Sequence, residues 1–363
     1  MTTLARIARA FLLAAALAGC GSMSGLERDV SPSQPLPTRF VESVPGERVR
    51  LLEAGPHGPL RPDGPTVVFV HGIPSSLYLW RNVLPIAAVD ARAAAFDLPG
   101  YGESDLPADG DYTYSALAER TDAVLDRLAR ESAGGQLVLV VNDLGSVLAL
   151  DWAARHPDRV AGLVFAEAIF MPAQAWYDQT TLLQQGFFFA FGSGAVARHM
   201  TVRTGLLYRN LLRLGAERDL SERERETYLR PYAAGRDGED GAPADWRERR
   251  RVVLDGPGPA TTLDGGLHDD PPRHPDDVVG VLNRTAAALD AMDEVPMLLV
   301  HAEPGFISNR EALDYARDHF DQLTVTHVRA GHFIPEDQPT DLGVAVLAWY
   351  RRAVLGQTAP SAP

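Results

Sequence analysis

The chain has 363 residues, of which 45% are hydrophobic and 23% are charged, so its composition is that of a globular protein. Every one of the 34 Lys+Arg residues is an arginine. This excludes Schiff-base chemistry on a lysine and a P-loop with its phosphate-binding lysine. The net charge of −14 argues against binding to nucleic acid, and the single cysteine excludes a disulfide within the chain or a cysteine-rich zinc site.

The N-terminal segment is typical of an export signal. Arg6 and Arg9 precede an apolar run over residues 11–18, which is too short to span a bilayer as a helix. Small residues lead up to Cys20, as they do before the acylated cysteine of a bacterial lipoprotein; a plain signal peptide with a chance cysteine is the alternative. We therefore predict an exported protein, lipid-anchored through Cys20 to a bacterial membrane and facing the periplasm or the cell exterior.

Short apolar or β-branched runs alternate with segments of helical spacing along most of the chain. The expected strands cover residues 49–53, 66–70, 91–96, 137–141, 160–165, 297–301 and 323–328. The expected helices cover residues 114–130, 147–156, 277–291, 310–319 and 341–354. This alternation implies parallel pairing of the strands, and therefore an α/β sandwich of three layers in which helices flank a mostly parallel sheet.

A long insertion breaks the alternation. It contains no convincing strand. Helical patches are expected at 181–191, 206–214 and 222–232, and a loop rich in Gly, Pro and Asp is expected at 255–275. We interpret it as a helical cap over the carboxyl ends of the strands, where open α/β sheets bind ligands. The predicted division is a lipoprotein signal peptide 1–20, a flexible tether 21–38, a first core part 39–171, the cap 172–274, a second core part 275–355 and a disordered tail 356–363.

The chemistry is expected where strands end. Gly145, two residues after Asp143, permits the sharp turn of a nucleophile elbow, with Asp in the place usually taken by Ser. Alone, Asp143 would be interpreted as a helix N-cap. The segment 71–74 follows a strand where an oxyanion loop is expected, and His332 follows the last strand. The order of these features along the chain is compatible with the order nucleophile, acid, histidine that α/β-hydrolases have.

The motifs resemble those of haloalkane dehalogenases, members of the α/β-hydrolase superfamily whose fold is an eight-stranded, mostly parallel sheet with a helical cap. The matching segments are 71–85, 97–105, 151–160, 166–172, 301–305 and 331–337. The resemblance is to the subgroup whose catalytic acid follows the sixth strand. It implies Asp143 as nucleophile, His332 as general base and Glu167 as the acid that orients His332. Glu303, after the seventh strand, is the fallback acid, and no cofactor or metal is implied.

Two positions depart from that subgroup where the halide must be held. The family places Trp after the nucleophile and Asn after His-Gly, and both side chains donate N–H groups to the departing halide. This chain has Leu144 and Ile73, whose side chains cannot donate. Their backbone N–H groups are still expected to form the oxyanion hole. The candidate lid residues that would line the substrate site are Trp176, Tyr177 and Trp246.

The predicted function is hydrolysis of a carbon–halogen bond in an apolar small molecule through an alkyl-enzyme ester, by a monomer that uses only water. One alternative is an epoxide hydrolase with the same triad, in which lid tyrosines protonate the epoxide oxygen. The candidate tyrosines are Tyr177, Tyr208, Tyr228 and Tyr232. The other alternative is a vestigial lipoprotein that binds an apolar ligand, which Ile73 and Leu144 favour and the retained triad opposes.

Overall fold

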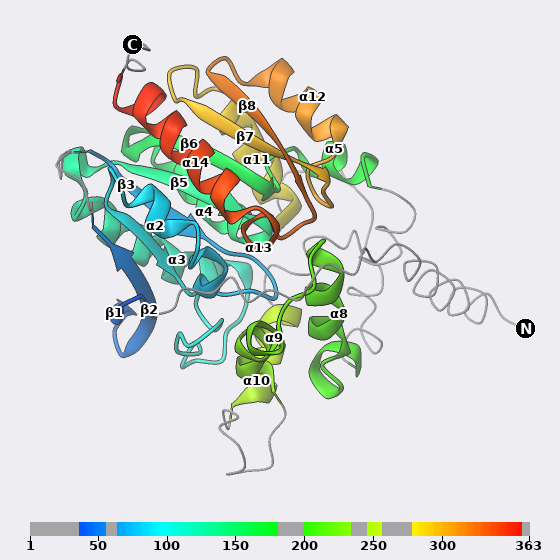
Figure 1. Cartoon of the computed structure of the whole chain (residues 1–363). Coiled ribbons are helices and arrows are strands. Elements are labelled where there is room, and N and C mark those ends of the chain that lie inside the picture. The colour runs from blue at the N-terminus through cyan, green and yellow to red at the C-terminus, as the bar shows by residue number, and fades with distance from the viewer. Residues whose placement is uncertain (1–35, 56–63, 181–198, 234–244, 256–277, 358–363) are drawn as a thin grey trace, which may run out of the picture.

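A computed structural model describes residues 36–55, 64–180, 199–233, 245–255 and 278–357 (Figure 1). Its eight-stranded sheet has the order β1-β2-β4-β3-β5-β6-β7-β8. The strands are β1 (Thr38–Val44), β2 (Glu47–Ala54), β3 (Thr66–Val70), β4 (Ala93–Phe96), β5 (Leu137–Asn142), β6 (Val160–Ala168), β7 (Met297–Pro304) and β8 (Leu323–Ala330). β2 is antiparallel to both β1 and β4, and strands β3 to β8 pair in parallel. Their carboxyl ends therefore share one edge of the sheet.

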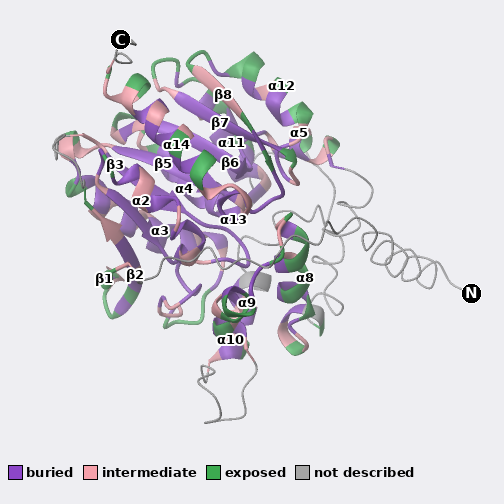
Figure 2. Cartoon of the chain, in the orientation of Figure 1, coloured by how far each residue is buried: buried purple, intermediate pink, exposed green. Residues whose placement is uncertain are grey.

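Helices cover both faces of this sheet, because its central strands are apolar on both sides. Every residue of β3 and β5 is buried, as a parallel sheet between two helical layers requires (Figure 2). The main flanking helices are α2 (Leu84–Ala87), α3 (Tyr114–Arg130), α4 (Asp143–Arg155), α11 (Val278–Asp290), α12 (Arg310–His319) and α14 (Pro339–Trp349). One hydrophobic cluster includes α3, α4, α11 and α12, and the other includes α2 and α14. The predicted α/β fold with an eight-stranded, mostly parallel sheet flanked by helices is confirmed.

The sequence analysis identified seven strands, and β1 was missed. Only Val41 of β1 is buried, so no apolar run marks this strand in the sequence. It forms because its backbone pairs with β2 at the edge of the sheet, from Thr38 onward. The short helical turns of the core are η1 (Leu77–Trp80), η2 (Ala133–Gly135), η3 (Pro157–Arg159), α13 (Ile334–Asp337) and η7 (Tyr350–Val354).

The described elements of the insertion between β6 and α11 (Val278–Asp290) are all helical. Its elements are α5 (Ala173–Asp178), η4 (His199–Arg203), α8 (Leu206–Gly215), α9 (Glu222–Leu229), η5 (Arg230–Tyr232) and α10 (Trp246–Asp255). Figure 1 shows α8, α9 and α10 grouped beside α13, outside the sheet. The helices expected at 206–214 and 222–232 are present, whereas α10 was not predicted. Its sequence is dominated by charged residues up to Arg251, which hides the apolar positions.

Several predicted segments lie outside the described residues: the signal peptide with Cys20, the tether up to residue 35, the helix at 181–191, most of the loop at 255–275 and the tail from 358. These stay predictions. Within the part of the chain that the structure describes, no helix is both long enough and apolar enough to cross a membrane.

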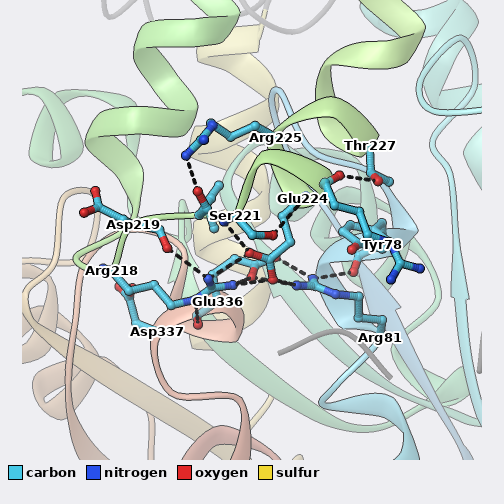
Figure 3. Close-up of polar contacts among 12 residues, drawn as sticks. Tyr78, Arg81, Arg218, Asp219, Ser221, Glu224, Arg225, Thr227, Glu336 and Asp337 are labelled. Carbon is cyan, nitrogen blue, oxygen red and sulfur yellow. Dashed lines mark hydrogen bonds and ion pairs between the residues drawn. The ribbon is translucent and has the colours of Figure 1, made fainter. Parts of the chain in front are cut away.

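A buried ion network joins this cap to the core (Figure 3). Arg81, just after η1, donates to Glu224 of α9 at 2.7 Å and to Glu336 of α13 at 2.5 Å. Arg218, between α8 and α9, donates to Glu224 at 2.8 Å and also to Glu336. The side chains of Glu224 and Glu336 are 0% and 1% exposed. Burial alone would raise the pKa of Glu224, but Arg218, the Ser221 N–H and Arg81 together lower it to about 2.

Glu336→Gln should lower the free energy of unfolding by about 3–5 kcal/mol, because it leaves two arginines facing a single buried carboxylate. The matched control is Arg127→Gln, which removes an exposed ion pair with Glu131 at 3.0 Å and should cost about 1 kcal/mol or less. Chemical denaturation of both variants measures the difference. Equal losses would show that the network does not hold the cap to the core.

Candidate active site

The turn between β5 and α4 raises Asp143 above the end of the sheet. Asp143 has a φ of 49°, in the left-handed region that non-glycine residues rarely adopt. Neighbouring glycines make room for it. A Cβ at Gly145 would lie 2.0 Å from the His71 carbonyl oxygen, and a Cβ at Gly72 would lie 2.3 Å from Asp143. The turn is therefore packed directly against the loop that follows β3, as a nucleophile elbow requires.

Three strand ends bring together Asp143, His332 and Glu167. His332 Nε2 lies 3.5 Å from Asp143 Oδ2, and His332 Nδ1 lies 3.2 Å from Glu167 Oε2. The side chain of Asp143 is 14% exposed and that of Glu167 is 0% exposed. The imidazole thus bridges a carboxylate at the end of β5 and a fully buried carboxylate at the end of β6.

Glu167 is held by a backbone cradle that the sequence analysis missed. Glu167 Oε2 accepts from the N–H groups of Phe306 at 2.8 Å and Ile307 at 2.7 Å, and Oε1 accepts from Ser308 at 3.2 Å. Gly305, with a φ of 59°, turns the chain after β7, and a Cβ there would lie 2.8 Å from Glu167 Oε1. The glycine that ends the motif 301–305 is the sequence signal for this cradle.

The fallback acid Glu303 is not brought to His332. Its side chain is 71% exposed and faces His301 and His327 at 4.0 and 3.8 Å. Glu167 is therefore the carboxylate that the fold places on the imidazole.

Two strand-end histidines have different electrostatic environments. Burial lowers the pKa of His71 to about 4, so this residue is neutral, and its Nε2 accepts from the Leu98 N–H at 2.9 Å. Burial also acts to lower the pKa of His332, but the hydrogen bond to Glu167 and the charges of Asp143 and Glu167 outweigh it and raise the pKa. His71 is a structural residue, whereas two carboxylates stabilise the charged form of His332, which can therefore accept a proton.

The two positions expected to form the oxyanion hole lie beside Asp143. The Ile73 N–H donates to Asp143 Oδ1 at 2.7 Å. Leu144 follows Asp143 in the first turn of α4, where backbone N–H groups have no partner within the helix. The side chains of Ile73 and Leu144 are 7% and 6% exposed and belong to the large hydrophobic cluster on the α4 face of the sheet.

The lid candidates are placed differently from one another. Trp176 is buried in the same hydrophobic cluster as Ile73 and Leu144. Tyr177 is partly buried. Trp246 packs under the guanidinium groups of Arg247 and Arg250, at 4.6 and 4.5 Å from the ring centroid.

Two of the four tyrosines considered for epoxide opening are engaged by other groups. The Tyr208 hydroxyl donates to the Arg250 carbonyl at 3.1 Å, and the Tyr228 hydroxyl donates to Glu336. Tyr232 stacks on Tyr208 at 4.3 Å, and its buried hydroxyl has no hydrogen-bond partner among the described residues. Tyr232 and the partly buried Tyr177 are therefore the two whose hydroxyls these contacts leave available.

Tyr101, which the sequence analysis did not consider, lies within electrostatic reach of Asp143. It is 2% exposed, and its ring meets the ring of His71 edge-on at 5.9 Å. Burial raises its pKa well above the ordinary value, and Tyr232 and Asp143 raise it further. Its hydroxyl is therefore protonated and can donate a hydrogen bond.

Comparison with known proteins agrees with this geometry. Residues 65–339 match the family model of the alpha/beta hydrolase fold. A haloalkane dehalogenase of Sphingobium indicum is 34% identical over 318 residues, which cover 86% of this chain and 95% of the relative. The chain belongs to the haloalkane dehalogenase family of α/β-hydrolases. It is thus a hydrolase of the haloalkane dehalogenase type.

Other members of the family give the same picture. A haloalkane dehalogenase of Mycolicibacterium smegmatis is 33% identical, over 89% of this chain and 94% of the relative. The crystal structure of haloalkane dehalogenase DbeA from Bradyrhizobium elkani superposes with a TM-score of 0.71 at 29% identity, covering 86% of this chain and 97% of that one.

Glu167→Gln should reduce turnover by at least about 10²-fold, because a neutral amide no longer orients and stabilises the imidazolium. The acidic limb of the pH–rate profile of this variant should also shift to lower pH, since Glu167 raises the pKa of His332. The isosteric control Glu303→Gln should change turnover by less than about threefold and leave the limb in place. Steady-state rates between pH 5 and 9 measure both effects. A larger loss in Glu303→Gln would move the catalytic acid to β7.

Proposed function

We propose that this enzyme hydrolyses the carbon–halogen bond of an apolar haloalkane through an ester on Asp143. The observation that carries the proposal is the continuous path from Glu167 through His332 to Asp143, with the Ile73 N–H on the other oxygen of Asp143. The family to which the chain belongs gives the leaving group.

In the first step, Asp143 attacks the carbon that carries the halogen. Because Oδ1 is held by the Ile73 N–H, Oδ2 is the oxygen free to form the new C–O bond. The halide leaves with the electron pair of the C–X bond, and an alkyl ester remains. The apolar surroundings from Ile73, Leu144 and Trp176 solvate the carboxylate poorly, which favours its attack on carbon.

In the second step, water attacks the ester carbonyl carbon. His332 Nε2 takes a proton from that water, while Glu167 holds Nδ1 and stabilises the imidazolium. The Ile73 N–H, with that of Leu144, stabilises the tetrahedral oxyanion. Collapse of the intermediate breaks the acyl C–O bond and releases the alcohol. The sum is R–X plus water giving R–OH, a proton and a halide ion.

Stabilisation of the halide is the unusual part of this site. Ile73 and Leu144 offer no side-chain donors, and each lost charge-assisted hydrogen bond costs about 1.5–3 kcal/mol. Two such losses correspond to a rate about 10²–10⁴-fold lower. We propose that the hydroxyls of Tyr101 and Tyr232 supply part of the missing stabilisation, since both residues are buried in the hydrophobic cluster of Ile73 and Leu144 and the Tyr232 hydroxyl has no partner among the described residues.

His332→Ala should trap the alkyl ester, because displacement at carbon needs no base but ester hydrolysis does. Intact-mass measurement after incubation with a bromoalkane should show one covalent adduct, which peptide mapping places on Asp143. The matched control is the double variant Asp143→Asn with His332→Ala, which should stay unmodified. An unmodified His332→Ala protein that still binds the substrate would refute Asp143 as nucleophile.

The wild type should release iodide and bromide much faster than chloride, because a poorer leaving group needs more stabilisation in the transition state. Leu144→Trp combined with Ile73→Asn should raise bromide release, by less than the 10²–10⁴-fold estimated loss, since overpacking by the indole costs about 1–3 kcal/mol. Halide assays with thermal melts separate chemistry from folding.

Two outcomes would contradict this account of the halide site. Efficient release of chloride by the wild type would show that other donors fully replace the missing pair. A folded double variant without any gain, beside a wild type that converts epoxides to diols, would favour the epoxide hydrolase instead.

A further inference from the structure

The outer edge of the sheet carries a second cluster of polar side chains, away from the triad. β7 and β8 pair in parallel with His301 opposite His327, and Glu303 lies two residues beyond His301 on the same face. The intervening residues Val300 and Ala302 belong to the hydrophobic cluster that includes α14. The cluster therefore lies on the opposite face, the one covered by α12.

The three side chains converge without bonding to one another. Glu303 Oε1 lies 4.0 Å from His301 Nε2 and 3.8 Å from His327 Nδ1, and one ligand atom from each residue lies within 4.8 Å of the others. These distances are too long for hydrogen bonds. Ligands of one tetrahedral zinc ion lie about 3–3.5 Å apart, given bonds of about 2.0–2.2 Å. Binding of an ion therefore requires the Glu303 side chain, which is 71% exposed, to turn and the two imidazoles to move closer together.

We propose that His301, Glu303 and His327 form a binding site for a divalent transition-metal ion of the zinc type. Two imidazoles and one carboxylate are a ligand set found in zinc sites that keep a fourth position for water. The same set is poor for Ca²⁺ or Mg²⁺, which prefer several oxygen ligands. Glu303 and His327, with Val328 and Arg329, line an open hollow of about 310 Å³, so an ion can enter with its water.

His301 is the buried member of the three, with 5% of its surface exposed. Its Nδ1 has no hydrogen-bond partner among the described residues, so the proton can reside there and leave the lone pair on Nε2, which faces Glu303. Arg317 and Arg329 are the nearby cations, and the carboxylate of Glu303 has to offset their repulsion of a metal ion.

An ion at this site would tie together the two strands that lead into the triad. β7 continues into the cradle of Glu167, and β8 continues to His332. Binding to the native state alone should therefore raise the melting temperature. This role is separate from the reaction proposed above, although the charge of Glu167 acts on His301.

The test uses the full-length protein without a histidine tag, stripped with chelator. Isothermal titration with Zn²⁺ should show one saturable site, and Co²⁺ should give the absorption bands of a tetrahedral or five-coordinate site. His327→Gln and Glu303→Gln, both at exposed side chains, should each weaken Zn²⁺ binding at least about tenfold. The control His319→Gln, at an exposed histidine paired with Asp290, should bind as the wild type does.

Zn²⁺ should also raise the melting temperature of the wild type but not that of His327→Gln, while Ca²⁺ and Mg²⁺ should leave it unchanged. The proposal is overturned if Zn²⁺ shows no saturable binding. It is equally overturned if binding survives in both His327→Gln and Glu303→Gln, or if His319→Gln abolishes it.

Discussion

The buried negative charge of Glu167 is the constraint on which the arrangement of the site depends. A carboxylate with no solvent exposure is costly unless hydrogen bonds and opposite charge compensate it. Three consecutive N–H groups after β7 and the imidazole of His332 provide that compensation. Because these partners come from two other strand ends, satisfying one charge fixes the relative positions of β6, β7 and β8. It also sets the orientation of the imidazole, and with it the direction in which Nε2 points.

The two carboxylates of the triad differ in their surroundings, and this difference can assign their roles. Glu167 accepts three backbone hydrogen bonds and is closed to solvent, so its charge is well stabilised and its oxygens are occupied. Asp143 accepts one backbone hydrogen bond on Oδ1 and is 14% exposed. Its second oxygen faces the imidazole of His332 at 3.5 Å. A carboxylate with few donors in apolar surroundings is the better nucleophile, and one with many donors is the better fixed charge.

The sequence was sufficient for the parallel core, because strands buried on both faces appear as continuous apolar runs and amphipathic helices repeat every 3.6 residues. The sequence was insufficient for an edge strand that buries few side chains, and for side chains whose proximity depends on the register between two strands. β1 has one buried side chain and escaped notice. Glu303 and Glu167 were both plausible partners of His332, since only the path of the chain after each strand places one of them on the ring. The approach of His301 to His327 depends on the register of β7 and β8, which 25 intervening residues of sequence do not reveal.

The loop carrying His332 is also fixed from the side of the cap. The Phe333 N–H donates to the Gly215 carbonyl at 2.7 Å, and Asp337 accepts from the N–H groups of Glu217 at 2.9 Å and Gly331 at 2.8 Å. Parting the cap from the core on this side would break those bonds and expose the ion network of Arg81, Arg218, Glu224 and Glu336. Buried ion pairs lose their compensation when partners separate, so opening along this seam is disfavoured. The loop that carries His332 and the segment from Gly215 to Glu224 are therefore held together, and separating them costs both the hydrogen bonds and the buried ion pairs.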